Sequence, residues 1–222
     1  MNLTFDETKA TPLCSIMGRN KSDKGSSDIQ SSWHNYTTVY YSLFKDLQDR
    51  PLRLFELGLG TNNPSIPSNM GIGGRPGASL YGWSEFFPRS AIYGADIDRD
   101  ILFQTDRIRT FFCDQTNPTI IQELWKQPEL EDPFDIIIED GLHTFEANVC
   151  FFENSIHKVN PDGYYIIEDI LFSEMNLFLT KIEEWEKKYP SCSFNMIAIP
   201  SKRNPYDNNL LVIHNHSHSL LI

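Results

Sequence analysis

LRLFELGLG, residues 52–60, decides the fold of this chain. Its leucines and Phe55 predict a short buried strand, which ends in a turn that contains Gly58 and Gly60. A strand that breaks into Gly-x-Gly lets a parallel α/β sheet accommodate a nucleotide-like ligand, because no Cβ separates the backbone from the ligand. The alternative interpretation is a Gly-rich turn that holds no ligand.

The residues around these glycines indicate which ligand the turn binds. A dinucleotide-binding fingerprint has a third glycine three positions after the second, and Asn63 stands there in this chain. The absence of this third glycine disfavours NAD as the ligand. Glu56, two residues before the first glycine, resembles the acid of motif I in the S-adenosylmethionine-dependent methyltransferases. We therefore expect Glu56, Gly58 and Gly60 to bind S-adenosylmethionine.

Strand and helix patterns alternate along the rest of the chain. Apolar runs predict strands at 52–57, 91–96, 108–113, 134–138, 164–167, 194–199 and 210–214, and helical spacing predicts helices at 33–47, 79–87, 98–107, 119–126, 145–159 and 173–188. Ser79 is a good N-cap. The alternation predicts an α/β fold with helices on both faces of a mostly parallel, seven-stranded sheet. Its last two strands should pair antiparallel.

Composition narrows the class of protein. The chain has 222 residues, a net charge of −11 and no extended cluster of Lys or Arg, so a nucleic-acid partner is not expected. No apolar run is long enough to cross a bilayer. The four cysteines are scattered without a CxxC spacing, which disfavours a zinc site and indicates reduced thiols in a cytoplasmic protein.

Polar residues follow the second and third predicted strands. Asp96 ends the second strand, where a carboxylate can accept hydrogen bonds from a ribose diol; capping of the following helix is its alternative role. Asp114 and Gln115 follow the third strand and would lie beside an adenine, unless they form an ordinary turn.

Acids also follow the fourth and fifth strands, which should be neighbours. Asp140, Glu168 and Asp169 would then converge at one edge and repel one another unless a cation neutralises them. Mg²⁺, which prefers oxygen ligands, is the simplest candidate. His143, three residues after Asp140, is a candidate general base.

Aromatic residues and a histidine in the first predicted helix are candidates for the acceptor site. His34 could reach the pocket, and Tyr36 and Tyr40 could form a wall for the substrate. Packing in the core is the alternative role for the two tyrosines.

Several stretches together resemble the macrolide sugar O-methyltransferases of the macrocin and mycinamicin type. The similarity covers roughly residues 18–169 and rests on GRNKSDKG at 18–25, HxY at 34–36, FELGLG at 55–60, GASLxxW at 77–83, IYGADI at 92–97, FDIIIEDGLH at 134–143 and GxYxIED at 163–169.

This resemblance implies a Rossmann-like class I methyltransferase fold and Mg²⁺-dependent O-methylation. It implies that Asp140, Glu168 and Asp169 hold the metal, with Asp140 also in the catalytic and cofactor site, and that His143 is the base. It also implies that the glycine turn and Asp96 bind the cofactor. Residues 1–32 would form a loop or lid and residues 33–222 the methyltransferase domain.

Two positions depart from the family pattern, since Glu139 replaces its first Asp and Leu142 its Ser. The chain also lacks the large N-terminal extension of the macrolide enzymes, so we expect a smaller acceptor, such as a sugar or sugar-linked metabolite. The alternatives are N-methylation of a small amine, with or without a phosphate group, an inactive cofactor-binding subunit and an NAD-linked enzyme. The sequence leaves a homo-oligomer open.

Overall fold

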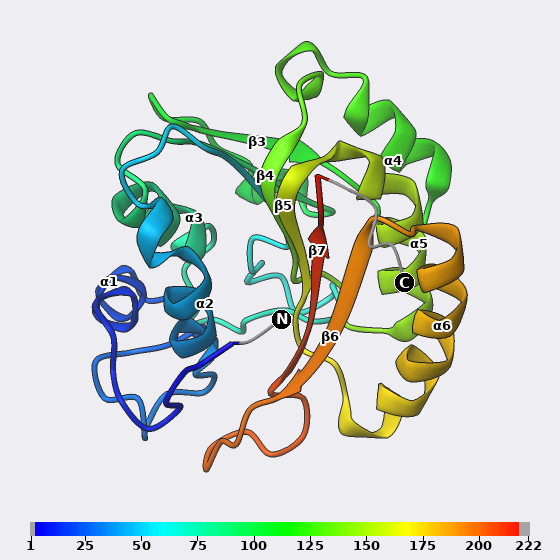
Figure 1. Cartoon of the computed structure of the whole chain (residues 1–222). Helices are drawn as coiled ribbons and strands as arrows, with labels where there is room; N and C mark the ends of the chain where they lie inside the picture. The colour runs from blue at the N-terminus through cyan, green and yellow to red at the C-terminus, as the bar shows by residue number, and fades with distance from the viewer. Residues whose placement is uncertain (1–2, 218–222) are drawn as a thin grey trace.

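The computed structural model describes residues 3–217 and contains a sheet of seven strands in the order β3-β2-β1-β4-β5-β7-β6 (Figure 1). The first five strands are parallel, whereas β7 pairs antiparallel with both β5 and β6. The strands are β1 (Arg53–Leu57), β2 (Ala91–Asp96), β3 (Ile108–Phe112), β4 (Phe134–Glu139), β5 (Val159–Ile167), β6 (Cys192–Ala198) and β7 (Asn209–Asn215). The predicted sheet and its closing antiparallel pair are confirmed.

Helices cover both faces of this sheet, with α1 to α3 on one side and α4 to α6 on the other (Figure 1). The α-helices are α1 (Pro12–Asn20), α2 (Tyr36–Phe44), α3 (Ala78–Phe86), α4 (Pro118–Trp125), α5 (Phe145–Ser155) and α6 (Met175–Lys188). Short 3-10 helices lie at η1 (Lys45–Leu47), η2 (Arg99–Ile101), η3 (Pro128–Leu130), η4 (Ile156–Lys158) and η5 (Phe172–Glu174). Among the described residues, none of the helices is both long and apolar enough to cross a membrane.

The core has two layers because successive side chains of a strand point to opposite faces. Leu54 of β1 packs with Tyr40 and Trp83 under α2 and α3. Its neighbour Phe55 packs with Trp125 and other aromatic residues under α4 and α5. The apolar run of β1 is therefore buried on both faces, as its sequence predicts.

The prediction of a loop throughout the first 32 residues is wrong at α1. Thr11 caps this helix through a hydrogen bond from the Cys14 amide, and Pro12 occupies its first turn, where a missing N–H costs nothing. Leu13 and Met17 are fully buried against the helices of the same face. The helix is only nine residues long, so tertiary packing stabilises it more than propensity does.

The prediction of a helix at 98–107 is also wrong. Only η2 forms there, after Asp98 accepts a hydrogen bond from the amide of Asp100. Phe103 then runs extended beside β3, because the Thr110 hydroxyl accepts from its amide and donates to its carbonyl. These contacts replace the bonds that a helix would need.

Candidate active site

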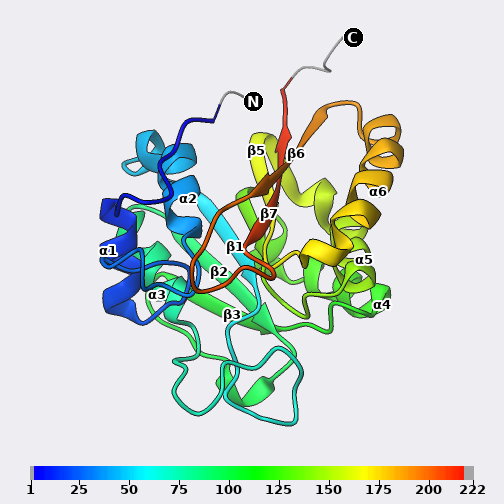
Figure 2. The same cartoon turned by 90° about the horizontal axis from the view of Figure 1, so that it is seen from below.

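A cavity of about 650 Å³ opens at the carboxyl ends of the parallel strands. Its wall includes the turn after β1, the end of β2 and the residues that follow β3, β4 and β5. The strand order reverses between β1 and β4, which is where α/β sheets bind ligands. The loop between β1 and α3, drawn in cyan to teal, extends beyond the sheet in Figure 2 and contributes residues 66–70 to the wall.

The glycine turn after β1 leaves no room for side chains. Gly58 has a φ of 91°, and a Cβ on it would lie 1.8 Å from the carbonyl oxygen of Asp140. Gly60 has a φ of 76°, and a Cβ there would lie 1.9 Å from the sulfur of Met70. The turn therefore requires glycine both for its left-handed backbone and for its contact with the segment after β4.

Asp96 lies on one side of the cavity with its carboxylate fixed by the backbone. Its two oxygens accept hydrogen bonds from the amides of Leu59 (2.7 Å) and Asp98 (2.8 Å). Burial raises the pKa of Asp96, and these hydrogen bonds oppose that effect. The predicted capping role belongs to Asp98, so Asp96 keeps free lone pairs toward the cavity.

Asp114 and Gln115 line the cavity next to this carboxylate. The Gln115 side chain donates to Glu139 (2.9 Å) and accepts from the amide of Leu142 (2.7 Å), so it ties the end of β3 to the end of β4. Burial raises the pKa of Glu139 to about 7. The contact of Asp114 and Gln115 with an adenine stays a prediction.

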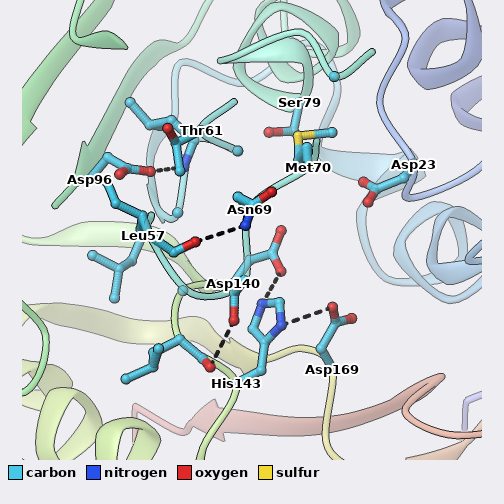
Figure 3. Close-up of a pocket in the computed structure, with 18 of the residues that line it drawn as sticks. Asp23, Leu57, Thr61, Asn69, Met70, Ser79, Asp96, Asp140, His143 and Asp169 are labelled. Carbon is cyan, nitrogen blue, oxygen red and sulfur yellow. Dashed lines mark hydrogen bonds and ion pairs between the residues drawn. The ribbon is translucent and has the colours of Figure 1, made fainter. Parts of the chain in front are cut away.

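His143 lies between two carboxylates on the opposite side of the cavity (Figure 3). Its Nε2 is 3.1 Å from Oδ1 of Asp140, and its Nδ1 is 3.4 Å from Oδ2 of Asp169. Burial opposes protonation of the imidazole, but the charges of Asp169 and Asp140 outweigh it and raise the pKa of His143 to about 10. His143 and Asp169 both have positive φ (59° and 53°), a strained conformation typical of functional sites.

Lys24 is a site residue that the sequence patterns did not predict. Its side chain is only 1 % exposed, and its Nζ lies 2.5 Å from Asp140, 2.6 Å from Glu168 and 3.5 Å from Glu56. Burial alone would lower the pKa of Lys24, but these three carboxylates raise it well above the ordinary lysine value. The sequence feature that could have identified Lys24 is its place in the GRNKSDKG stretch at 18–25, which carries part of the family resemblance.

Glu56 does not line the cavity, contrary to the prediction that it contacts the cofactor. It is fully buried, and its oxygens accept hydrogen bonds from the Ser79 hydroxyl and from Nε1 of Trp83. Ser79 is therefore not the N-cap of α3, a place that Gly77 takes. Glu56 acts behind the wall, where it joins β1 to α3 and faces Lys24.

The predicted acceptor residues separate into two groups. Tyr36 and Tyr40 are fully buried and are not part of the cavity wall; the hydroxyl of Tyr36 donates to Asp169 (2.7 Å), and that of Tyr40 donates to Glu168. Their predicted role as a substrate wall is corrected to one of supporting the acids. His34 does line the cavity, with Nε2 3.5 Å from Asp169, and so does the half-exposed Trp33.

The acids after β4 and β5 meet at one edge as predicted, but they are not equivalent. Among residues 3–217, Asp140, His143 and Asp169 have potential metal-ligand atoms within 4.8 Å of one another, as do His34, Asp169 and Asp207. Glu168 belongs to neither set. Its two oxygens accept hydrogen bonds from Tyr40 and Lys24.

The charges of this edge fit a divalent cation. Burial raises the pKa values of Glu56, Glu168 and Asp169, that of Glu168 well above the ordinary carboxyl value. A further cation would stabilise the ionised form of such clustered acids, and Mg²⁺ accepts their oxygens as ligands. Asp140 and Asp169 are the acids placed to hold it.

Several curated proteins with similar sequences are named as O-methyltransferases; no family model matches the chain. The chain is 30 % identical over 137 residues to 8-demethyl-8-α-L-rhamnosyl tetracenomycin-C 2′-O-methyltransferase of Streptomyces olivaceus, covering 62 % of this chain and 33 % of that protein. It is 34 % identical over 140 residues to demethylmacrocin O-methyltransferase of Streptomyces fradiae, covering 63 % and 32 %. The matched region thus spans about a third of these relatives.

The solved structure of MycE methyltransferase in complex with Mg, S-adenosylhomocysteine (SAH) and mycinamycin VI has the same fold. Its TM-score is 0.70 at 22 % identity, over 94 % of this chain and 56 % of MycE. Human methyltransferase-like protein 13 with SAH matches at a TM-score of 0.51, over 77 % of this chain and 74 % of that one. The chain therefore has the Rossmann-like class I methyltransferase fold.

Proposed function

We propose that this chain transfers a methyl group from S-adenosylmethionine to a hydroxyl of a small sugar or sugar-linked molecule. One observation carries the proposal: a single cavity has the Gly58–Gly60 turn and Asp96 on one side and His143 between two carboxylates on the other. Similar proteins, such as 8-demethyl-8-α-L-rhamnosyl tetracenomycin-C 2′-O-methyltransferase and mycinamicin VI 2″-O-methyltransferase, are named as O-methyltransferases, which supports the same reaction class.

The cofactor would occupy the side of the cavity next to β1 and β2. The backbone of Gly58 and Gly60 can approach the cofactor closely, and Asp96 can accept hydrogen bonds from its ribose. Asp114 and Gln115 line the same cavity, and we expect them to lie beside the adenine of the bound cofactor. Positioning supplies most of the acceleration, since the sulfonium donor is already activated.

The acceptor hydroxyl would lie beside His143. A bond forms between this oxygen and the methyl carbon as the carbon–sulfur bond breaks, which leaves S-adenosylhomocysteine, and the neutral imidazole takes the hydroxyl proton. The charges of Asp169 and Asp140 raise the pKa of His143 to about 10, and a divalent cation on these carboxylates would offset that effect and leave the imidazole free to act as a base. Asp140 and Asp169 hold the ring and stabilise the imidazolium that results. A Mg²⁺ ion held by these two carboxylates would polarise the acceptor hydroxyl and lower its pKa.

The character of the chain supports a small-molecule acceptor. The net charge of −11 disfavours a nucleic acid. The half-exposed Trp33 offers an apolar ring face at the cavity wall next to His34, where a sugar ring could pack. The cytoplasmic location and the homo-oligomer stay predictions.

Product analysis tests the proposal directly. The purified chain is incubated with S-adenosylmethionine and separate panels of sugars, nucleotide-linked sugars and amino alcohols, with Mg²⁺ or with a chelator, and products are identified by mass spectrometry. We expect one added methyl on a hydroxyl and loss of turnover with the chelator. A methylated amine would support the alternative N-methyltransferase, and cofactor binding without any product would support an inactive subunit.

A further inference from the structure

Two histidines lie side by side at the end of β7, outside the cavity wall. His214 belongs to β7, and His216 follows directly after its last residue. Residues two apart on an extended chain point to the same face, so both imidazoles lie on one face of the sheet. Their ring centroids are 4.2 Å apart, with an interplanar angle of 71°. His214 pairs with Tyr164, toward the start of β5, whereas the cavity lies beyond the other end of that strand.

Both rings are held by their neighbours. The amide of His216 donates to the carbonyl of Ser191 (2.8 Å), which continues the antiparallel pairing past the end of β7. The ring of His214 stacks on Tyr164 with centroids 4.5 Å apart. Nε2 of His216 lies 3.0 Å from Oγ of Ser193. Because these contacts already order both side chains, little conformational entropy is left to lose when a ligand binds between them.

The surroundings of His214 and His216 suit a metal ion. Burial and the neighbouring His216 lower the pKa of His214, and the backbone carbonyl and the carboxylate of Asp162 oppose this effect. The His214 ring is therefore neutral at neutral pH, and the neutral imidazole is the form that binds a metal. A hydrogen bond from Nε2 of His216 to Ser193 would leave Nδ1 with the lone pair that a metal needs.

We propose that His214 and His216 form a metal site separate from the acidic edge, which binds a transition-metal ion such as Zn²⁺ through one nitrogen of each imidazole. Imidazole suits Zn²⁺, Cu²⁺ and Ni²⁺, whereas Mg²⁺ prefers oxygen ligands, so the two sites differ in chemistry. The carboxylate of Asp162 interacts with both rings and adds a negative charge beside the ion. The site uses no cysteine, and water would complete the coordination.

A bound ion would stabilise the folded chain. In the unfolded chain the two imidazoles take many relative positions, so the ion binds the folded chain more tightly and raises its free energy of unfolding. The strand β7 lies between β5 and β6. The ion would therefore fix the end of the strand that joins the antiparallel part of the sheet to the parallel part.

Titration of the full, untagged chain with Zn²⁺, followed through the NMR signals of the imidazole protons, tests the proposal. Single His→Asn variants assign the signals. We expect the signals of His214 and His216 to shift together, at a Zn²⁺ concentration at least about tenfold lower than the signal of His157, because two linked ligands bind more tightly than one. His157 is an exposed single imidazole in η4. Equal concentrations for all three signals would indicate an adventitious ion only and overturn the proposal.

A variant at one ligand tests whether the two imidazoles act together. His216→Asn should raise the Zn²⁺ concentration that shifts the His214 signal by at least about tenfold, whereas the control His157→Asn should leave it unchanged. His216 lies past the end of β7, and a thermal melt without Zn²⁺ verifies that the variant is folded. An unchanged response of His214 in folded His216→Asn would overturn the proposal.

The outcome is independent of the proposed methyl transfer. The signals of His34 and His143 report separately on ions that bind at the cavity, which both residues line. Loss of the Zn²⁺ response at His214 in His216→Asn should therefore leave the responses of His34 and His143 unchanged. A parallel loss at His34 and His143 would mean that the ion binds at the cavity, and the proposal would be wrong.

Discussion

At the scale of single residues, the site is a set of carboxylates whose partners decide their roles. Asp96 accepts from two backbone amides, Glu168 from Tyr40 and Lys24, and Asp169 from Tyr36. Carboxylates at similar strand ends therefore have different roles. The sequence shows that acids lie at or just after the ends of β2 to β5, but the partner of each acid comes from elsewhere in the chain.

His143 is expected to be the residue on which turnover depends most. Loss of a general base typically costs about 10²–10⁴ in rate, so His143→Ala should reduce kcat by that factor and leave the calorimetric affinity for S-adenosylmethionine within about twofold. His157→Ala, on the exposed surface at η4, is the control and should retain full turnover. Full activity of His143→Ala would mean that another group takes the proton.

Trp33 is expected to act on the acceptor rather than on the cofactor. It is 48 % exposed and lines the cavity beside His34. Loss of an aromatic contact of about 1 kcal/mol corresponds to about a fivefold change, so Trp33→Ala should raise KM for the acceptor by about that factor with kcat nearly unchanged. Trp33→Phe should restore part of the affinity. An unchanged KM in steady-state kinetics would remove Trp33 from the acceptor site.

At the scale of secondary-structure elements, the strands are predictable and several connections are not. The apolar run of β4 and the Gly-x-Gly turn after β1 are local signals, and both lie where expected. The helix expected at 98–107 is absent because Thr110 of β3 binds the backbone of Phe103. A contact with a neighbouring strand thus overrides local helical spacing.

The turn after β1 should tolerate no side chain. Gly58→Ala places a methyl group against the carbonyl of Asp140 and forces a residue with a Cβ to a φ of 91°, so it should lower Tm and displace Asp140. We expect a loss of about 2 kcal/mol or more, measured by denaturant unfolding.

Gly73→Ala, in the loop between β1 and α3, is the control for this variant. A Cβ at Gly73 meets nothing within 4 Å, so the free energy of unfolding should change by less than about 0.5 kcal/mol. Equal effects of the two alanines would show that the contact of Gly58 with Asp140 does not limit stability.

At the scale of the whole molecule, the fold places one cavity at the edge where the carboxyl ends of the parallel strands meet. Helices α1 to α3 and α4 to α6 cover opposite faces of the sheet (Figure 1). The N-terminal segment reaches the strand ends through Lys24, which pairs with Asp140 and Glu168. Ligand binding in such a cavity links elements from both halves of the chain. The free energy of unfolding of the whole chain should therefore rise when a ligand occupies the cavity.

S-adenosylmethionine at about 100 times its Kd should stabilise the folded chain by about 2.7 kcal/mol. For a domain of this size this corresponds to a rise in Tm of about 5–10 °C. NAD at the same concentration should leave Tm unchanged, which a thermal melt followed by circular dichroism can measure. A rise with NAD and none with S-adenosylmethionine would exclude the proposed cofactor.

The sequence alone determined the parallel sheet, the glycine turn and the acids at the strand ends, because apolar periodicity and glycine placement are local properties. It did not determine that Glu56 lies behind the cavity wall or that Tyr36 and Tyr40 support the acids. Nor did it place Lys24, which meets Asp140 and Glu168 across 116 and 144 residues of sequence. Only the packing of the whole chain decides which charge lies beside which, since Coulomb interactions depend on distance in space and not along the chain.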